Sequence, residues 1–268
     1  SVDRYNFLKV LREGNPPAKL YCVGDDWQSI YRFSGSDMAL FNQFPEYFGA
    51  TEINKIETTY RFGEPLVSLS SYFIQRNKAQ IQKDIHSFDS EMKTELEFYS
   101  YDRRDYCNMI GQLVASIPSD KSIFLLGRYS FDDYYLSFMY QSIKEGNRFF
   151  YVIGGRKIEF LTIHKSKGLE YGTVIMPATD VEIDRPHKNG LEVSYINGEI
   201  GYSIFANGKQ YSNSFYESKI EIREMMMEES RILYVAMTRA IDNFIWFNNI
   251  DAKGNNWGKM LEEMSGEV

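Results

Sequence analysis

Short apolar runs that alternate with helix-like stretches constrain the fold of this sequence more than any other feature. Strand-like runs lie near 20–23, 52–56, 96–99, 122–126, 158–162, 173–176 and 243–247, and helical spacing recurs near 2–11, 64–76, 104–117 and 133–145. Such alternation is typical of a parallel sheet with helices on both faces. The sequence therefore predicts an α/β fold.

One region interrupts this alternation. Residues near 184–214 carry short alternating segments that are punctuated by Gly and Asn, for example at 191–195. Alternation between turn residues is the pattern of antiparallel strands joined by tight turns. We expect a hairpin-bearing insertion here.

Charge limits the partners that the surface can attract. The 268 residues carry a formal net charge of −7, although 43% of them are apolar, which is enough for a substantial core. An acidic protein does not attract nucleic acid over its whole surface. Any contact with DNA must therefore lie in a local basic or aromatic strip.

The sequence also predicts a compartment. Its two cysteines, Cys22 and Cys107, have no metal-ligand spacing, so we expect two core thiols in a reducing cytoplasm. No apolar run reaches the roughly 18 residues of a membrane span. The chain opens at Ser1 instead of Met, and we expect it to be a piece of a longer cytoplasmic protein without a membrane partner.

Polar clusters that directly follow apolar runs are the places to look for ligands, because ligand-binding loops lie at the carboxyl ends of parallel strands. The first cluster, at 23–35, contains Gln28, Tyr31 and Phe33. The Gln28 amide can donate to a phosphate oxygen and orient a water, and the two rings offer faces to bases. A surface glutamine beside two core aromatics is the simpler interpretation of this cluster taken alone.

The second cluster, at 57–62, contains Tyr60 and Arg61. The guanidinium can pair with a terminal phosphate through two parallel hydrogen bonds, and the ring can stack on a nucleobase. A Tyr-Arg pair by itself is also a common surface arrangement.

The third cluster, at 160–170, places Thr162, His164, Lys165 and Lys167 in one Gly-containing loop. These side chains supply the donors and the positive charge that hold a nucleic-acid backbone. Nothing near His164 in the sequence completes a nucleophilic triad or a metal site, and we predict no metal ligands in this chain.

The fourth segment, at 228–240, has the pattern of a helix end that leads into a strand and contains Arg239. An arginine at this place can bind the last carbonyls of its helix. It can also act as a second arginine finger.

In this order, the four segments resemble motifs III, IV, V and VI of the UvrD/Rep branch of superfamily 1 helicases, and the first resembles in particular the helicase IV group of bacteria. The resemblance implies a RecA-like fold and ATP as the cofactor. It implies that Gln28 senses the terminal phosphate, that Arg61 and Arg239 contact it, that Tyr60 stacks on adenine and that Glu170 faces the ribose or the phosphates.

The same resemblance implies a strip of contacts with DNA. Tyr31 and Phe33 match positions that stack on single-stranded bases, although many relatives carry Trp in place of Phe33. Thr162 and His164 match the motif that touches the strand and its backbone. Many relatives also have a second Arg where this sequence has Ser34, so one link between the site and DNA is weaker here.

The sequence lacks two parts of such a motor. It has no G-x-x-x-x-G-K-[ST] phosphate loop, and it has no acidic pair upstream of the first cluster to hold Mg²⁺. Asp25 and Asp26 belong to the motif III segment and are not that pair. We expect the Mg²⁺ ligands in a missing N-terminal segment, and we expect this chain alone to be inactive as an ATPase.

We therefore predict residues 1–49 to be the C-terminal part of a first RecA-like domain and residues 50–268 to be the second. The expected function of the parent is ATP-driven unwinding, with the 3′→5′ direction that the resemblance implies. Its partners would be single-stranded DNA, duplex junctions and the N-terminal helicase domain of the same chain. Two alternatives remain at this point: a non-catalytic DNA- or protein-binding module, and the helicase-like arm of a recombination nuclease.

Overall fold

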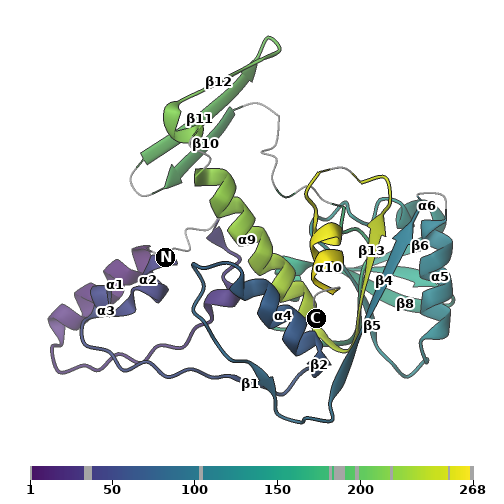
Figure 1. Ribbon diagram of the computed structural model, residues 1–268, viewed down its shortest axis with the longest axis horizontal. Helices are drawn as coiled ribbons and strands as arrows, with labels where there is room; N and C mark the ends of the chain where they lie inside the picture. Colours follow the sequence, from purple (N-terminus) through teal and green to yellow (C-terminus); the bar gives the residue numbers. More distant parts are fainter. Residues whose placement is uncertain are drawn as a thin grey trace.

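The computed structural model describes residues 2–32, 38–102, 105–180, 183, 191–196, 199–217, 220–252 and 254–265. Its main body is an eight-stranded sheet with the order β2-β4-β13-β9-β5-β8-β7-β6 (Figure 1). These strands are β2 (Glu64–Pro65), β4 (Lys93–Tyr101), β5 (Ile123–Gly127), β6 (Gln141–Glu145), β7 (Arg148–Ile153), β8 (Arg156–Thr162), β9 (Tyr171–Met176) and β13 (Ala240–Asn249).

Most of this sheet is parallel. Every neighbouring pair from β2 to β8 runs in the same direction, whereas β6, β7 and β8 are antiparallel to one another. The α/β prediction is confirmed, with an antiparallel extension at one edge. The described part of the interval between Arg61 and Thr162 adds its longer strands to this sheet, so it forms no separate globular domain.

Helices cover both faces of the sheet. On one face, α4 (Leu66–Gln75), α9 (Ile220–Met237) and α10 (Trp257–Ser265) pack against Val174 of β9 and Phe244 of β13. On the other face, α5 (Tyr106–Ser116) and α6 (Leu136–Met139) pack against Ile175 and Ile245. Successive residues of a strand point to opposite faces, so each buried strand contributes to both cores.

Three helices of the N-terminal region, α1 (Val2–Gly14), α2 (Ala39–Asn42) and α3 (Phe44–Phe48), lie apart from the sheet in Figure 1. In contrast, Trp27 of η1 (Asp26–Gln28) is buried in the core beneath α9. The expected strand at 20–23 is not formed, and Tyr21 is 89% exposed. No strand of the described residues pairs with this segment, and an apolar run needs such a partner to become a buried strand. The expectation of a core thiol is likewise wrong for Cys22, which is exposed; Cys107 is half-buried.

The expected strand at 52–56 is also wrong. All five positions are exposed, and regular pairing begins only at β1 (Thr58–Thr59), which joins β3 (His86–Ser87) in a two-stranded parallel sheet. Ile53 and Ile56 lie in a segment without a neighbouring strand among the described residues. Their spacing alone therefore does not produce a strand.

The helix expected at 133–145 is reduced to the single turn of α6, after which the chain turns into β6. The backbone of Gly146 has a φ of +59°, and Gly146 and Asn147 form the turn between β6 and β7. Glycine adopts this left-handed conformation without steric cost, so a Gly-Asn pair is a hairpin signal. This short-range signal overrides the helical spacing of the apolar residues.

A second, smaller sheet projects from the body beside the start of α9 (Figure 1). It consists of β10 (Leu191–Ile196), β11 (Glu199–Ala206) and β12 (Lys209–Ser212), which are antiparallel in that order, and α8 (Ser214–Glu217) follows it. Residues 184–190 of the expected insertion lie outside the described residues. In the part of the chain that the structure describes, no helix is long and apolar enough to cross a membrane.

Candidate nucleotide and DNA contact site

The first part of the site is a group that we name the arginine cluster: Arg61, Glu170 and Arg239. Arg61 follows β1, Glu170 precedes β9, and Arg239 lies between α9 and β13. Arg61 donates from Nε to a Glu170 carboxylate oxygen at 3.0 Å and from Nη1 to the Thr238 carbonyl oxygen at 3.1 Å. Three segments that are far apart in the sequence therefore meet at one place.

Arg61 and Glu170 are accessible to a ligand. Their side chains are 28% and 59% exposed. Exposed ion pairs of this kind contribute only about 0–1 kcal/mol, because water competes for both partners. Another anion can thus replace Glu170 at Arg61 at little cost.

Arg239 is buried, with 1% of its surface exposed. Its guanidinium donates to the Val235 carbonyl at 2.9 Å, to the Leu169 carbonyl at 2.9 Å and to the Thr238 hydroxyl at 3.2 Å. Burial, and after it the charge of Arg61, lowers the pKa of Arg239 to about 10. The guanidinium remains charged at neutral pH, and an anion placed beside both arginines would relieve their repulsion.

Tyr60 lies next to the arginine cluster and is 70% exposed. Its ring stacks on that of Phe88, with centroids 4.6 Å apart and an interplanar angle of 30°. The register of β1 and β3 explains the pair, since Thr59 faces Ser87 and the two rings follow these residues. An exposed aromatic surface of this kind suits a flat ligand such as a nucleobase.

Gln28 lies in η1, where its side-chain amide donates to an Asp25 carboxylate oxygen at 2.6 Å. Asp25 also accepts from Lys83 at 2.8 Å, and Asp26 accepts from the backbone N–H of Ile81 at 2.7 Å. These two carboxylates therefore fix the loop around Gln28.

The second part of the site is a group that we name the ring cluster: Tyr31, His164 and Lys167. The Tyr31 hydroxyl donates to the His164 carbonyl at 3.2 Å, and His164 Nε2 donates to the Ile30 carbonyl at 3.0 Å. The Lys167 ammonium lies 5.0 Å from the centre of the Tyr31 ring and donates to the Gln28 carbonyl at 2.9 Å. These contacts join the loop after β8 to the loop around Gln28.

Burial determines the charge of the ring cluster. It lowers the pKa of His164, and the nearby charge of Arg128 lowers that pKa further. Burial also lowers the pKa of Lys167. His164 is therefore neutral at physiological pH and acts here as a hydrogen-bond donor to a carbonyl, not as a cation.

The remaining predicted DNA contacts lie around the ring cluster. Thr162 ends β8 and is half-buried, and Lys165 is exposed on α7 (Ile163–Ser166). Phe33 lies outside the described residues. The structure thus brings most of the predicted residues into two linked clusters, of which one is rich in charge and the other in rings.

Several supporting residues of the site are not among those predicted from the sequence. Arg128 follows β5 and binds Glu229 of α9 with hydrogen bonds of 3.0 and 2.6 Å, and both side chains are largely buried. Tyr234 is buried and lies within electrostatic reach of Asp25, Arg61 and Arg239, while burial is the main cause that raises its pKa. A polar residue directly after an apolar run was the available signal for Arg128; nothing local in the sequence marks Tyr234.

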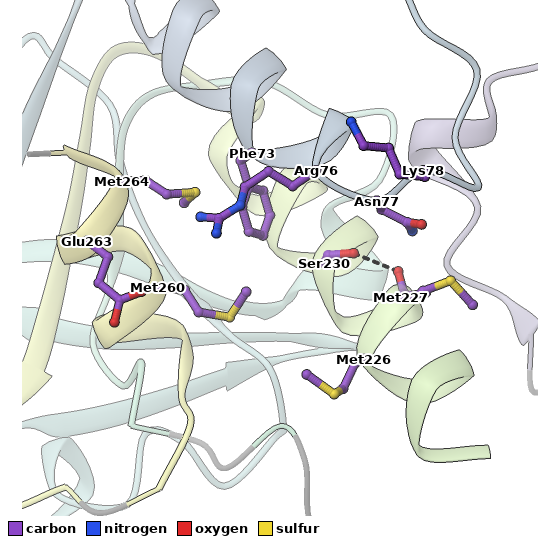
Figure 2. Close-up of a pocket in the computed structure, with 10 residues that line it drawn as sticks. All are labelled: Phe73, Arg76, Asn77, Lys78, Met226, Met227, Ser230, Met260, Glu263 and Met264. Carbon is purple, nitrogen blue, oxygen red and sulfur yellow. Dashed lines mark hydrogen bonds between the residues drawn. The ribbon is translucent and has the colours of Figure 1, made fainter. Parts of the chain in front are cut away.

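The site residues do not line the cavity that lies among the helices on this side of the sheet. This cavity of about 370 Å³ lies between α4, α9 and α10. Figure 2 shows the methionine side chains among the residues that line it. Among the described residues, no group of three or more His, Cys, Asp or Glu side chains is arranged to hold a metal ion.

Comparison with known proteins adds the family. A model of the UvrD/REP helicase N-terminal domain matches residues 2–49, and a model of the UvrD-like helicase C-terminal domain matches residues 137–247. DNA helicase IV of Escherichia coli is 29% identical over 240 residues, which are 90% of this chain and 31% of that protein.

Two other relatives match shorter parts. One is a subunit of an ATP-dependent helicase/nuclease from Oceanobacillus iheyensis, which is 28% identical over 117 residues, or 40% of this chain and 9% of that protein. The other, the ATP-dependent DNA helicase srs2 of Schizosaccharomyces pombe, is 27% identical over 122 residues, or 44% of this chain and 14% of that protein. This chain thus spans less than a third of the length of each of these relatives.

Both family models describe the same type of helicase, and they match in chain order. Together with the mostly parallel sheet of RecA type and the similarity to DNA helicase IV over most of the chain, they support one conclusion. The chain belongs to the UvrD-like helicase family.

Proposed function

We propose that this chain carries the phosphate-sensing and strand-binding part of an ATP-dependent DNA helicase that moves 3′→5′ along one strand. The observation that carries the proposal is the meeting of Arg61 and Arg239. Arg61 bonds to Glu170 and to the Thr238 carbonyl, beside a buried Arg239 whose pKa is lowered by burial and by Arg61. An accessible arginine beside a buried one suits a multiply charged anion better than any neutral ligand.

Each residue of this part has a distinct role in the proposal. Tyr60, stacked on Phe88, would hold the adenine. Arg61 would exchange Glu170 for the terminal phosphate, and Arg239 would follow by giving up one of its carbonyl partners. Glu170 would then face the ribose or the phosphates. Gln28 would report the phosphate to the DNA side, since its carbonyl accepts from Lys167.

When bound, ATP supplies the phosphoryl group whose transfer to water drives translocation. The phosphate loop and the Mg²⁺ ligands are absent from these 268 residues, and we propose that another segment of the parent protein supplies them. In that arrangement, residues 1–49 belong to the first RecA-like domain and residues 50–268 form the second. The parent would work in the cytoplasm on single strands and duplex junctions.

The isolated chain provides the first test. It should hydrolyse no ATP, with or without DNA, because two arginines cannot replace the phosphate loop and its metal. It should nevertheless bind tripolyphosphate, measured by calorimetry, and Arg61→Ala should abolish that binding. A matched control is Arg148→Ala, which removes an arginine that is also ion-paired to a glutamate, Glu159, outside the cluster.

Two results would contradict the proposal. ATP turnover by the purified isolated chain would show that the phosphate loop is not required. Absence of polyphosphate binding, combined with tight binding of DNA, would favour a non-catalytic binding module, because such a module needs no phosphate sensor.

A further inference from the structure

Exposed aromatic rings gather in the segment between β5 and β6. Phe131, Tyr134 and Phe138 are 66%, 58% and 72% exposed. Phe131 stacks on Tyr129, with ring centroids 5.0 Å apart and an interplanar angle of only 9°. Single exposed rings are ordinary, but two pairs of rings in contact within one short segment point to an interaction site.

This segment starts beside the predicted DNA contacts. Gly127, the last residue of β5, pairs with Thr162, the last residue of β8, in parallel register. The loop that starts at Arg128 therefore runs alongside α7, which contains His164. The charge of Arg128 acts on His164, which places these two side chains near each other.

Hydrogen bonds and a cation–π contact fix Tyr129, on which Phe131 stacks. The backbone N–H of Tyr129 donates to an Asp132 carboxylate oxygen at 2.9 Å. The Arg128 guanidinium lies 4.6 Å from the centre of the Tyr129 ring and is itself fixed by Glu229 at 2.6 Å. Rings fixed in advance lose little conformational entropy when a ligand binds.

We propose that Tyr129 and Phe131 form an additional base-stacking platform that extends the single-strand path beyond the ring cluster. This inference rests on the proposed function, since it presupposes that a strand crosses His164. The platform takes bases of any identity, because every base has a π-face. Lys165, exposed on the adjacent loop, would pair with the backbone of the same strand.

A DNA strand fits this surface better than a protein partner. The nearest carboxylates bind internal partners: Asp132 accepts from the Tyr129 N–H, Asp133 from the Tyr151 hydroxyl and Glu229 from Arg128. The surface that remains offers flat rings with a guanidinium stacked on one of them, which is the composition of single-strand binding sites.

A fluorescent variant provides the first test. The tryptophans of the chain, Trp27, Trp246 and Trp257, are at most 1% exposed, so a new surface tryptophan would dominate any change that a surface ligand causes. Phe131→Trp should be quenched when an oligonucleotide of twenty thymidines is added. Phe205→Trp, at a 52% exposed phenylalanine of the projecting sheet, should not respond.

The affinity of the same oligonucleotide provides the second test. Phe131→Ala should weaken binding by roughly 5- to 140-fold, which corresponds to the range for one base stacked on one ring. Phe205→Ala should leave the affinity unchanged. An abasic nucleotide lacks the base but keeps its phosphate. When abasic nucleotides are placed at successive positions of the oligonucleotide, the quenching of the Phe131→Trp protein should be lost at one defined position.

The outcomes separate this inference from the proposed function. DNA binding that is unaffected by Phe131→Ala, with no quenching of Phe131→Trp, would overturn the platform and leave the helicase proposal standing. Loss of DNA binding in every protein, including the unmodified chain, would overturn both. A tryptophan signal that depends on the concentration of the chain and not on DNA would assign the patch to self-association instead.

Discussion

Burial lowers the pKa of a basic group in both the arginine cluster and the ring cluster, but the resulting charge states differ. In the arginine cluster, Arg239 keeps its charge at neutral pH, since its pKa falls only to about 10, and that charge remains close to Arg61. In the ring cluster, burial lowers the pKa of His164 further below neutrality. The Lys167 ammonium donates to the Gln28 carbonyl and lies over the Tyr31 ring. The arginine cluster therefore holds two positive charges close together, whereas the histidine of the ring cluster is neutral.

This difference indicates which ligand each region suits. A multiply charged phosphate gains most where cations have already been desolvated, because the protein has met that cost in folding. A base offers a flat face and little charge, so it gains most from rings that are fixed in place. Lys167 belongs to the ring cluster and donates to the Gln28 carbonyl, so we propose that it couples phosphate sensing at Gln28 to contact with the strand.

The largest expected effect lies in the arginine cluster. In the parent protein, Arg61→Ala or Arg239→Ala should lower the rate of DNA-stimulated ATP hydrolysis by roughly 10³ or more, the range known for arginine fingers. Binding of DNA without nucleotide should change little. The measurement is the steady-state ATPase rate at saturating DNA, with Arg148→Ala as the control. Normal ATP hydrolysis by both variants would mean that the two arginines are structural and do not contact the phosphate.

The next effect lies in the ring cluster. Tyr31→Ala should weaken single-strand binding by about 1–3 kcal/mol if the ring stacks on a base. Tyr31→Phe keeps the ring and loses only the hydrogen bond to the His164 carbonyl, so it should retain most of the affinity. The measurement is fluorescence anisotropy with a labelled oligonucleotide.

Thermal unfolding is the necessary companion measurement, because the Tyr31 ring is half-buried and also packs against the main core. A Tyr31→Ala protein with a strongly lowered Tm and unchanged DNA affinity would make this tyrosine a core residue. In that case the stacking role would fall to residues outside the ring cluster.

The sequence predicted the sheet well where strands are buried on both sides. The runs near 173–176 and 243–247 lie in β9 and β13, whose apolar residues supply both cores. It failed where an apolar run has no neighbouring strand, as at Tyr21 and Ile56, which are 89% and 80% exposed. Periodicity reports the preference of a segment; pairing depends on residues far away in the sequence.

The site shows the same division. His164 directly follows the apolar run of β8 and was identifiable because strand ends carry ligand-binding loops, whereas the run at 52–56 that marked Arg61 forms no strand. The direction in which these side chains point was not identifiable, since the contact of Arg61 with the Thr238 carbonyl depends on how α9 crosses the sheet. Phe88, which stacks on Tyr60, follows a two-residue strand that is too short to leave a pattern.

A smaller effect concerns pH. His164 has a lowered pKa in the folded chain, so the unfolded chain takes up its proton first as the pH falls below about 6.5. The stability that neutral His164 provides is complete above that pH and is lost as the pH falls toward the lowered pKa. His164→Gln, which can still donate to the Ile30 carbonyl, should therefore lose less stability than the unmodified chain between pH 7.5 and 5.5.

The measurement is the free energy of unfolding in urea at both pH values, with His86→Gln as the matched control. The comparison between variants is essential, because burial raises the pKa of Asp132 to about 6, and that group makes the fold more stable as the pH falls. An equal loss of stability in His164→Gln and in the unmodified chain would contradict the neutral, buried state of this histidine.

The smallest expected effect is a difference between Lys165 and Lys167 in how the DNA affinity depends on salt. Lys165 is exposed, so if it contacts a phosphate, Lys165→Ala should reduce the slope of log affinity against log salt by about 0.7, the value for one single-strand contact. Lys167 is held by the Gln28 carbonyl at 2.9 Å and by the Tyr31 ring, and burial lowers its pKa. Lys167→Ala should therefore change the slope less and lower the Tm more. Lys209→Ala, at an exposed lysine of β12, should change neither. Equal losses of slope for the first two variants would mean that Lys167 leaves the Gln28 carbonyl when DNA binds, and the ring cluster would then be a second site for phosphates.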